Sequence, residues 1–165
     1  METYLNKYLS GIELYLGIKK SNDERNVFVF GDELHHIVNV MRHRNNDIIH
    51  ITDGEGSIYK AKITEISKPE LKAEIIGIYR YENINKNLTF CLPLLKNSDR
   101  LEFALEKCIE FGITNFLFFR SKNCVMKSFK EERFTKIAVS AMKQTLRSFI
   151  PSIKFTDNVK NILQF

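Results

Sequence analysis

The 165-residue sequence lacks tryptophan, contains few cysteines and has no long hydrophobic run. Its three cysteines, Cys91, Cys108 and Cys124, are odd in number and scattered along the chain. Small secreted domains that depend on disulfide bonds carry a denser and usually even-numbered set. The cysteine content therefore excludes a disulfide scaffold and predicts a protein of the reducing cytoplasm.

The apolar stretches are too short to cross a bilayer. Ile113–Phe119 is among the longest of them, whereas a membrane-spanning helix needs about 20 apolar residues. Residues 1–17 include acidic groups, a lysine and an asparagine, and so lack the continuous apolar core of a secretion signal. We expect neither membrane association nor a signal peptide, and the chain contains no internal repeat or low-complexity tract.

Positive charge is concentrated in the second half of the chain. Residues 1–83 hold 11 basic and 13 acidic side chains, for a net charge of −2, whereas residues 84–165 hold 14 and 7, for +7. Residues 120–147 alone contain 8 basic and 2 acidic side chains. Such a concentration is typical of proteins that bind polyanions, nucleic acid above all. A lysine-rich face that only meets solvent has the same composition, so charge leaves both interpretations open.

Residues 1–83 contain short apolar runs at the spacing of β-strands. The Asp53–Gly56 turn contains two glycines, which supply the positive φ angles of a tight hairpin. Asp32 is expected to cap a short helix over residues 32–41. The strands are expected at residues 27–30, 47–51, 57–66 and 71–79. These elements predict a small curled sheet or barrel with one short helix.

A polar, asparagine-rich stretch at residues 81–87 predicts a linker, and we place the boundary between two domains after Asn83. The pattern that follows is strand, helix, strand, helix. Asp99 and Glu102 have the spacing of a capping box at the start of the first helix. Gly112 suits the left-handed residue at the end of that helix.

The second helix is the longest predicted element. Ser128 and Glu131 form another capping box, and Pro151 is expected to stop the helix after about Phe149. The two strands of this half are expected at residues 88–92 and 113–119. The second strand has almost no polar alternation, which is typical of a strand buried on both faces. The order predicts an α/β unit with parallel strands joined by a right-handed crossover.

The long helix has an apolar side and a cationic side. Apolar residues recur from Phe134 to Phe149 at the spacing of a helix that faces a core. The opposite side carries Arg133, Lys136, Ser140, Lys143 or Gln144, and Arg147. Such a row suits contacts with the phosphate and sugar groups of a nucleic acid. It suits a solvated helix face equally well.

No known catalytic or metal-binding pattern is present. The histidines at positions 35, 36, 43 and 50 lack the helical i, i+4 spacing and the cysteine partners of a zinc site, so no metal is expected. Cys108 lies on the apolar stripe of its helix, which favours packing over catalysis. Cys124 has basic neighbours that favour a thiolate, but no histidine lies nearby in the sequence to act as a base.

Five segments form an ordered series of motifs along the chain. His36–Arg42 resembles "H-x-x-x-V-L-R", with Met41 at the Leu position; Thr52–Gly54 matches "x-D-G", and Tyr59–Ile63 matches "Y-x-A-x-I". Arg100–Ile113 is similar to "K-x-E-x-x-I-Q-K-x-x-E-L-G-V", and Lys136–Pro151 to "K-I-x-x-x-A-x-E-Q-x-x-R-x-x-V-P". In this order the motifs resemble those of the uracil-N3 methyltransferases of small-subunit ribosomal RNA (RsmE type).

The resemblance implies a mixed α+β and α/β fold. Residues 1–83 would form a PUA-like β-barrel that binds RNA, and residues 84–165 the first half of a SPOUT-type α/β domain with a trefoil knot. It also implies methyl transfer from S-adenosylmethionine to N3 of a uridine, with ribosomal RNA or the small ribosomal subunit as partner and a homodimer as assembly. Because Watson–Crick pairing hides N3, the target is expected to be unpaired. The residues expected to contact RNA are His36, Arg42, Lys96, Arg100, Arg120, Lys127, Arg133, Lys136, Gln144 and Arg147.

Two segments of the family have no counterpart in the sequence. These are a "G-P-E-G-G" segment and an "L-G-x-x-I-L-R-x-E-T-A" segment, which build the knot and most of the cofactor pocket. We therefore expect a truncated domain without the knot-forming segment, in which no cofactor-binding or catalytic residue is identifiable. The alternatives are a non-catalytic RNA-binding protein derived from this family and a remnant with little function.

Overall fold

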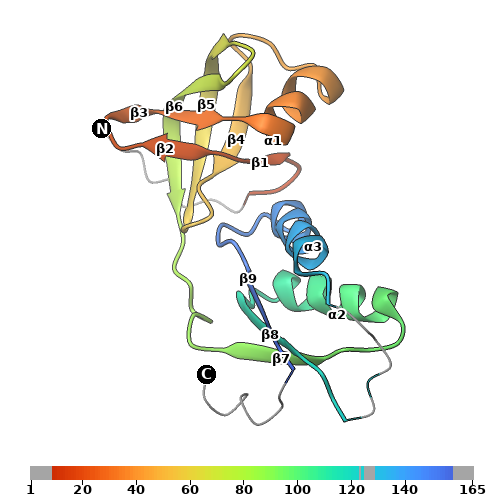
Figure 1. The fold of residues 1–165 in the computed structure, drawn as a ribbon. Helices are drawn as coiled ribbons and strands as arrows, with labels where there is room; N and C mark the ends of the chain where they lie inside the picture. The colour runs from red at the N-terminus through yellow and green to blue at the C-terminus, as the bar shows by residue number, and fades with distance from the viewer. Residues whose placement is uncertain (1–8, 123, 125–128, 158–165) are drawn as a thin grey trace. The chain divides into compact units, whose positions relative to one another are not determined.

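The computed structural model describes residues 9–122, 124 and 129–157. Contacts divide the chain into two compact units, unit 1 (Met1–Glu82) and unit 2 (Asn83–Phe165) (Figure 1). No helix in the described part of the chain has the length and apolar character needed to span a membrane.

Unit 1 is built on a six-stranded sheet in the order β1-β4-β5-β6-β3-β2. Its strands are β1 (Leu14–Leu16), β2 (Ile18–Lys20), β3 (Asp23–Val29), β4 (Ile48–Thr52), β5 (Ser57–Ile66) and β6 (Leu71–Arg80). β1 runs parallel to β4, and the other neighbours are antiparallel. The short strands β1 and β2, which lack a strong periodic pattern, are additions to the predicted set.

The sheet closes on itself at Gly17. β1 and β2 are the two edges of the sheet, yet only this one residue separates them in the chain. The Gly17 N–H donates to Thr52 O of β4 at 3.0 Å, while a Cβ at Gly17 would lie 2.7 Å from Phe28 O of β3. Strands from both sides of the seam therefore approach the same backbone, which confirms the expected curled barrel.

The barrel interior is apolar and well buried. Its core consists of Tyr15, Val27, Val29, Leu34, Ile37, Ile49, Ile51, Tyr59, Ala61, Ile63, Leu71, Ala73 and Ile78. Most of these side chains alternate along the strands with polar residues that face outward, as expected for a curled antiparallel sheet. Leu34 and Ile37 come from the short helical segment, so burial of these two residues holds that segment against the barrel.

The helical segment consists of α1 (Gly31–His35) and a π-helical turn, η1 (His36–Val40). The helix begins after Phe30, which makes no side-chain cap, and Asp32 lies inside its first turn. The predicted cap at Asp32 is therefore wrong. Gly31 has a φ of 58° and is the first helical residue, so the N-cap position falls on Phe30, two residues before Asp32.

The turn between β4 and β5 has the predicted hairpin chemistry. Gly54 and Gly56 have φ angles of 75° and 115°. Asp53 Oδ1 accepts hydrogen bonds from the backbone of Glu55 and Ser57 at 2.8 and 3.0 Å. Asp53 Oδ2 accepts one from Tyr59 Oη at 2.8 Å, and Thr52 Oγ1 donates to Ser57 O at 2.9 Å. The Asp-Gly pair thus shapes the turn.

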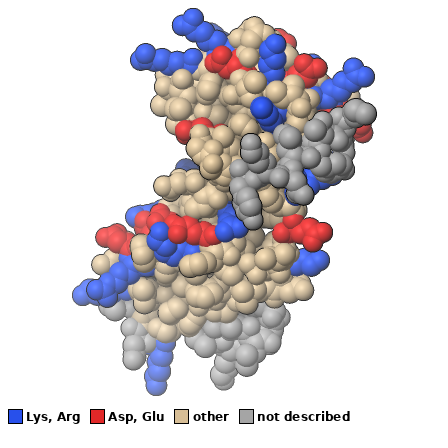
Figure 2. Space-filling view, turned by 180° about the vertical axis from the view of Figure 1, so that it is seen from behind, with Lys and Arg blue, Asp and Glu red and all other residues tan. Residues whose placement is uncertain are grey.

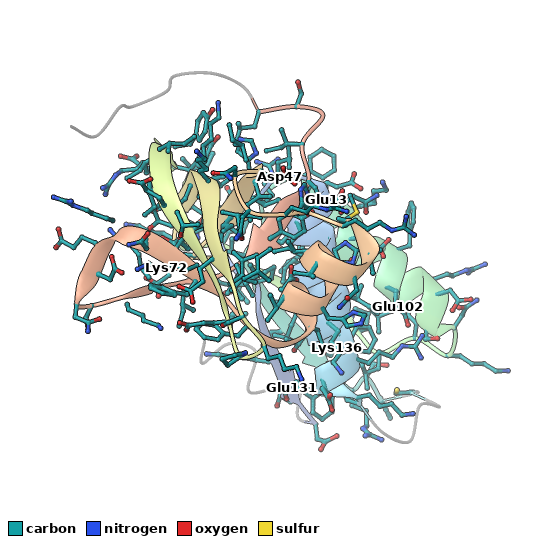
Figure 3. The ribbon with its side chains drawn as sticks, turned by 90° about the horizontal axis from the view of Figure 1, so that it is seen from above. Glu13, Asp47, Lys72, Glu102, Glu131 and Lys136 are labelled. Carbon is teal, nitrogen blue, oxygen red and sulfur yellow. The ribbon has the colours of Figure 1, made fainter. Side chains whose placement is uncertain are left out.

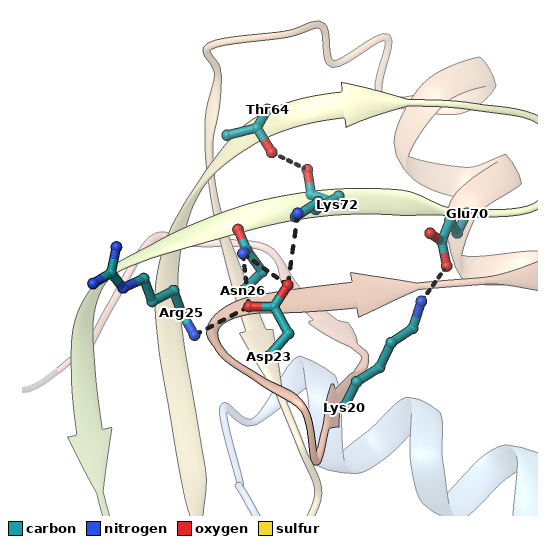
Figure 4. A network of polar contacts seen from close by, with 7 residues as sticks. All are labelled: Lys20, Asp23, Arg25, Asn26, Thr64, Glu70 and Lys72. Carbon is teal, nitrogen blue, oxygen red and sulfur yellow. Dashed lines mark hydrogen bonds and ion pairs between the residues drawn. The ribbon is translucent and has the colours of Figure 1, made fainter.

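Ion pairs fasten the strands at the end of the barrel drawn in Figure 4. Lys20 Nζ contacts Glu70 Oε2 at 2.7 Å, and Lys72 Nζ contacts Asp23 Oδ2 at 3.6 Å. The Asn26 side chain also donates to Asp23 Oδ1 at 2.8 Å, and this bond is the main reason that the pKa of Asp23 is lowered. These contacts join β2 and β3 to β6 and the turn before it.

Unit 2 contains a parallel three-stranded sheet in the order β7-β8-β9, with two helices (Figure 1). The elements are β7 (Thr89–Pro93), α2 (Ser98–Glu110), β8 (Asn115–Phe119), α3 (Glu131–Gln144) and β9 (Ser152–Thr156). The predicted parallel pairing of the first two strands is confirmed. Phe116, Leu117 and Phe118 of β8 are all buried, because β8 is the central strand of the sheet.

The cap of α2 differs from the predicted one. Asn97, not Asp99, is the N-cap, and its side chain accepts the N–H groups of Asp99 and Arg100 at 2.8 and 3.4 Å. The C-terminus agrees with the prediction, because Gly112 has a φ of 82°. The N–H of Ile113 bonds back to Cys108 O at 3.0 Å, which completes a Schellman-type end.

The second helix is shorter than predicted at both ends. It starts after Lys130, which makes no side-chain cap, so the expected capping box at Glu131 is wrong, and its other member, Ser128, lies outside the described residues. It stops at Gln144 because Leu146 adopts a φ of 55° and the Arg147 N–H bonds back to Met142 O at 2.9 Å. After this end the chain continues into β9 (Ser152–Thr156), a strand that the sequence prediction lacked.

Candidate nucleic-acid interface

The basic segment of unit 1, defined as residues 36–47, follows the short helix α1, of which Leu34 is the buried residue. Met41 N–H donates to His36 O, five residues earlier, at 3.0 Å, which is the hydrogen bond of a π-helical turn. Such turns occur often at functional sites. Arg42 comes next with a φ of 61°, a left-handed conformation that an arginine rarely adopts. The segment therefore leaves the barrel through two uncommon backbone conformations in succession.

Asp47 closes the basic segment. Its Oδ2 accepts the Arg44 N–H at 2.9 Å and lies 3.3 Å from His43 Nδ1, while the Asp47 N–H donates to Arg44 O at 3.1 Å. The backbone hydrogen bond from Arg44, and after it the contact with His43, holds the pKa of Asp47 below its usual value. Asn46, with a φ of 77°, fits a left-handed turn position. These contacts fix the backbone between Arg44 and the start of β4.

A surface hollow of about 570 Å³ opens beside this segment. Its lining residues are Val38, Arg42, His43, Arg44, Asn45 and Ile66. The side chains of Arg42, His43 and Arg44 and the amide of Asn45 thus supply the polar part of the lining, and Val38 and Ile66 supply the apolar part. Neither Arg42 nor Arg44 forms an ion pair with a described carboxylate, although the charge of Arg44 helps to lower the pKa of Asp47.

Two histidines flank a buried tyrosine behind the basic segment. The rings of His36 and His43 each lie 6.1 Å from the ring of Tyr15, centroid to centroid. Tyr15 Oη is buried and has no hydrogen-bond partner within the described ranges. Burial, and after it the charges of Glu13 and Glu33, raises the pKa of Tyr15 to about 12, so the phenol stays neutral at physiological pH.

His36, one of the predicted RNA contacts, faces Glu13. Its Nε2 lies 3.5 Å from Glu13 Oε1, and both side chains are partly exposed. Glu13 and Asp47 both lie near this side of unit 1 in Figure 3, which is consistent with their contacts to the histidines on either side of Tyr15. The predicted residues His36 and Arg42 are therefore brought to one region of the barrel.

In unit 2, several predicted RNA contacts already have protein partners. Arg133 on α3 forms an ion pair with Glu102 on α2 at 2.6 Å, and Lys136 pairs with Glu132 one turn away at 2.9 Å. Basic and acidic side chains lie next to one another on the face shown in Figure 2. Arg133 and Lys136 also line a hollow of about 710 Å³ together with Glu102, Lys130, Glu131, Glu132 and Ile137. This hollow carries mixed charge, unlike the one in unit 1.

Two other predicted contacts bind protein groups at element ends. Arg120 Nε donates to Asp157 Oδ1 at 2.8 Å, and the Arg147 guanidinium donates to Glu110 O, the last residue of α2. Arg147 thus caps one helix from the end of the other. The remaining predicted residues, Lys96, Arg100 and Gln144, are exposed, and Lys127 lies outside the described residues.

Three residues of the unit 1 hollow were missing from the sequence prediction. His43, Arg44 and Asn45 directly follow the "H-x-x-x-V-L-R" match that ends at Arg42. The sequence shows that these residues are polar or basic, but its hydrophobic periodicity places them only in the loop before β4 and gives them no role. The left-handed φ of Arg42, which turns the chain around the hollow, has no sequence signature in an arginine.

The described residues offer little support for other chemistries. No group of three or more potential metal ligands occurs among them. Cys91, Cys108 and Cys124 form no disulfide bond among the described residues. Burial raises the pKa of Cys108, which disfavours its nucleophilic thiolate form.

Comparison with protein families gives two matches along the chain. Residues 82–165 match the model of an RNA methyltransferase domain, and residues 31–76 match that of an RNA methyltransferase PUA domain. The first match alone covers half of the sequence. The chain belongs to the RNA methyltransferase family.

Individual relatives agree with this assignment. The chain is 33% identical over 143 residues to the ribosomal RNA small subunit methyltransferase E of Buchnera aphidicola, covering 80% of this chain and 54% of the relative. A probable rRNA methyltransferase structure from Porphyromonas gingivalis superposes with a TM-score of 0.76 at 27% identity, covering 92% of this chain and 63% of the other. The chain thus spans about half the length of the curated relative.

A solved structure that contains a bound ligand has a similar fold. The ribosomal RNA small subunit methyltransferase E of Neisseria gonorrhoeae, bound to S-adenosyl methionine, superposes with a TM-score of 0.73 at 24% identity over 88% of this chain and 62% of that one. The predicted fold class is confirmed. Unit 1 is the PUA-like barrel of an RNA methyltransferase, and unit 2 corresponds to part of the SPOUT-type α/β domain.

Proposed function

We propose that this chain acts in the methylation of small-subunit ribosomal RNA, at N3 of a uridine, with S-adenosylmethionine as the methyl donor. The observation that supports this proposal most strongly is that both units match, in order, the two domains of the RNA methyltransferase family. The curated relative at 33% identity is a small-subunit ribosomal RNA methyltransferase. We further propose a cytoplasmic protein that works on ribosomal RNA or the small subunit as a homodimer.

The chemistry requires an accessible and partly deprotonated uracil. N3 carries the proton that pairs with adenine, so the base must be unpaired for a methyl group to reach it. In the proposed reaction the N3 proton passes to solvent water, the methyl group moves from S-adenosylmethionine to N3, and S-adenosylhomocysteine is released. Nearby cations stabilise the negative charge that develops on the uracil ring. We assign no catalytic base among the described residues, because positioning together with cationic stabilisation is sufficient for so acidic a nitrogen.

RNA binding is supported by the placement of charge in unit 1. Arg42 and Arg44 lie at one hollow and form no ion pair with a described carboxylate. Guanidinium groups suit phosphate recognition because they present several N–H donors in one plane. In unit 2, Lys96 before α2 and Arg100 in its first turn are exposed cations, which favour the approach of a polyanion to that unit.

Backbone and side-chain groups at the carboxyl ends of the unit 2 strands are bonded within the protein. Ligands of open α/β sheets bind at the carboxyl ends of the strands. At that end of β7 and β8, the Leu94 N–H donates to Phe119 O at 2.9 Å and the Arg120 N–H to Thr156 O at 3.1 Å. The Arg120 side chain is held by Asp157. We therefore assign no described residue to the cofactor.

The test combines RNA binding and methyl transfer in one preparation. The purified chain is incubated with tritium-labelled S-adenosylmethionine and small-subunit ribosomal RNA made by transcription, which carries no modification. Labelled RNA is digested to nucleosides, and mass spectrometry identifies the methylated atom. A matched control uses the same RNA annealed to complementary DNA, because pairing of N3 must abolish the transfer.

The proposal expects label in 3-methyluridine with the free RNA only. Label in another nucleoside would refute the N3 assignment. Salt-dependent RNA binding without any transfer would overturn methylation by this chain and favour the non-catalytic RNA-binding alternative. Absence of RNA binding would overturn both.

A further inference from the structure

The segment between β6 and β7, residues 81–88, connects the two units (Figure 1). Its composition is polar and rich in asparagine, which is typical of a loop or linker without regular structure. Its backbone and side-chain groups nevertheless form several hydrogen bonds with the elements on either side. These bonds decide how much of the segment is free to rotate.

The first residue of the segment belongs to the barrel. The Tyr81 N–H donates to Gly56 O at 2.9 Å. This bond continues the pairing of β5 and β6 beyond its last partners, Ser57 and Arg80. Because a ladder bond of this kind holds the backbone against the neighbouring strand, Tyr81 moves with unit 1.

Asparagine side chains attach the following residues to unit 2. Asn83 Nδ2 donates at 3.0 Å to Oγ1 of Thr114, a buried residue just before β8. From β8 itself, Asn115 Nδ2 donates to Lys86 O at 2.8 Å. The bonded residues are 31 and 29 positions apart in the chain. Both bonds are therefore tertiary contacts within unit 2.

Asn85 binds the end of α2. Its Nδ2 donates to Gly112 O at 3.1 Å. The Asn85 N–H donates to Asn83 Oδ1 at 3.2 Å, and the Leu88 N–H donates to Asn85 O at 2.9 Å, so residues 83–88 form a bonded turn. We call Asn83, Asn85 and Asn115 the asparagine clasp, because their side chains fasten this turn to unit 2.

Only Glu82 lies between the two anchored stretches. It is exposed and forms no hydrogen bond or ion pair with a residue of the described ranges. Peptide bonds are planar, so rotation at this point is confined to φ and ψ of Glu82, ψ of Tyr81 and φ of Asn83. The boundary between the two compact units also falls directly after Glu82.

We propose that Glu82 is a single-residue pivot between the units, and that the asparagine clasp keeps residues 83–88 rigid as part of unit 2. Hinges in proteins are often a few residues at the ends of elements that absorb changes in φ and ψ. The pivot lets the units change orientation without loss of a hydrogen bond described within either one. It is a property of the chain itself and does not depend on the proposed function.

The first test is nuclear magnetic resonance of the unmodified chain in solution. Residual dipolar couplings of backbone N–H groups are fitted to a separate alignment tensor for each unit, and nitrogen relaxation gives the order parameter S² of each amide. We expect Tyr81 to fit the tensor of unit 1, and residues 84–88 to fit that of unit 2. Rigid backbone has an S² of about 0.85 and flexible backbone one below about 0.6, and we expect low values only at the amides of Glu82 and Asn83.

The second test opens the clasp. The double variant N83A/N85A removes the amide groups that bind Thr114 and Gly112. The matched control N87A removes an exposed asparagine of the same segment that forms no hydrogen bond with a described residue. In N83A/N85A we expect S² of residues 84–87 to fall from about 0.85 to below about 0.6, while N87A keeps the values of the unmodified chain.

The third test changes the pivot itself. Glu82→Pro fixes φ of residue 82 and restricts ψ of Tyr81, whereas Glu82→Gly widens the range of both angles of residue 82. The difference between the alignment tensors of the two units should shrink in E82P and grow in E82G.

Three results would overturn the proposal. One common alignment tensor for both units of the unmodified chain would exclude a pivot. An S² below about 0.6 throughout residues 83–88 would exclude a rigid clasp and make the whole segment a flexible linker. Unchanged tensors in both E82P and E82G would place the rotation at another residue.

Discussion

Replacement of Gly17 by alanine should strongly destabilise the barrel. A Cβ at this position would lie 2.6 Å from Ile51 Cγ2 and 2.7 Å from Phe28 O. Ordinary contacts of a Cβ are longer than about 3.4 Å, so both neighbours must move by most of an ångström. Phe28 O belongs to the backbone of β3 and cannot rotate away as a flexible side chain could. The φ of Gly17 is not in the left-handed region, so the cost arises from crowding alone.

The expected loss of unfolding free energy is about 3 kcal/mol. Overpacking of a filled core costs about 1–3 kcal/mol, and the upper end applies here because one obstacle is backbone at the seam of the barrel. The matched control is Gly31→Ala. A Cβ at Gly31 meets no atom within 4 Å, but the residue has a φ of 58°, so only the backbone conformation is penalised, by about 1–2 kcal/mol.

Urea unfolding followed by tyrosine fluorescence measures both variants. All six tyrosines lie before residue 82, so the signal reports unit 1, and the absence of tryptophan leaves it undisturbed. With a slope of about 1–3 kcal/mol per molar urea, Gly17→Ala should lower the midpoint by about 1 M or more. A shift no larger than that of Gly31→Ala would refute the argument that the two sides of the seam meet at Gly17.

Three further predictions concern helix ends and the basic segment. Asn97→Ala should lower the unfolding free energy of unit 2 by about 1 kcal/mol, because two N–H groups lose their acceptor; Asn97→Asp, measured by the same thermal melt, should retain most of it. Arg147→Met should cost about 1 kcal/mol through loss of the hydrogen bond to Glu110 O, whereas a change in RNA affinity with unchanged stability would contradict this structural role. The pKa of Asp47 is lowered chiefly by the hydrogen bond from the Arg44 N–H. The ionised Asp47 side chain therefore contributes to stability above the unfolded pKa of about 3.9, and this contribution is lost as the pH falls through the lower folded pKa. In an acid titration, Asp47→Asn should lose less unfolding free energy than the unmodified chain over that pH range.

Sequence reasoning found the elements with strong periodic or turn signals. β5 at Ser57–Ile66 lies at its predicted bounds, and the Asp-Gly turn before it has the expected positive φ angles. The buried strand β8 was predicted from its lack of polar alternation. In each case the local residue pattern and tertiary burial favour the same structure. A single sequence was therefore sufficient to predict these elements.

The errors lie where tertiary contacts decide local structure. Strands β1 and β2 have three residues each, too few for a period, and exist because the barrel must close at Gly17. The second helix was extended to Phe149 because its apolar spacing continues, but Leu146 takes a left-handed conformation normally left to glycine. Asn97 was overlooked as a cap because Asp99 offered an equally good motif two residues later.

The candidate site was found in part. The resemblance supplied His36 and Arg42, which lie in one region of unit 1. The hollow, with Arg44 and Asn45 on its lining, depends on a π-helical turn that widens the helix by one residue, and no sequence pattern specifies such a turn. Conversely, Arg133 and Arg147 have the spacing of a binding ridge on their helix, and only the fold reveals their protein partners.

The linked ends of α2 and α3 have a consequence for local unfolding. Both helices finish with the same hydrogen-bond pattern, around Gly112 and Leu146, and Arg147 from the second end bonds to Glu110 O at the first. Neither final turn can open without loss of a contact to the other. Amide hydrogens in the two final turns should therefore exchange with solvent in a single cooperative opening, and this corner of the domain would behave as one foldon although more than thirty residues separate its halves in the chain.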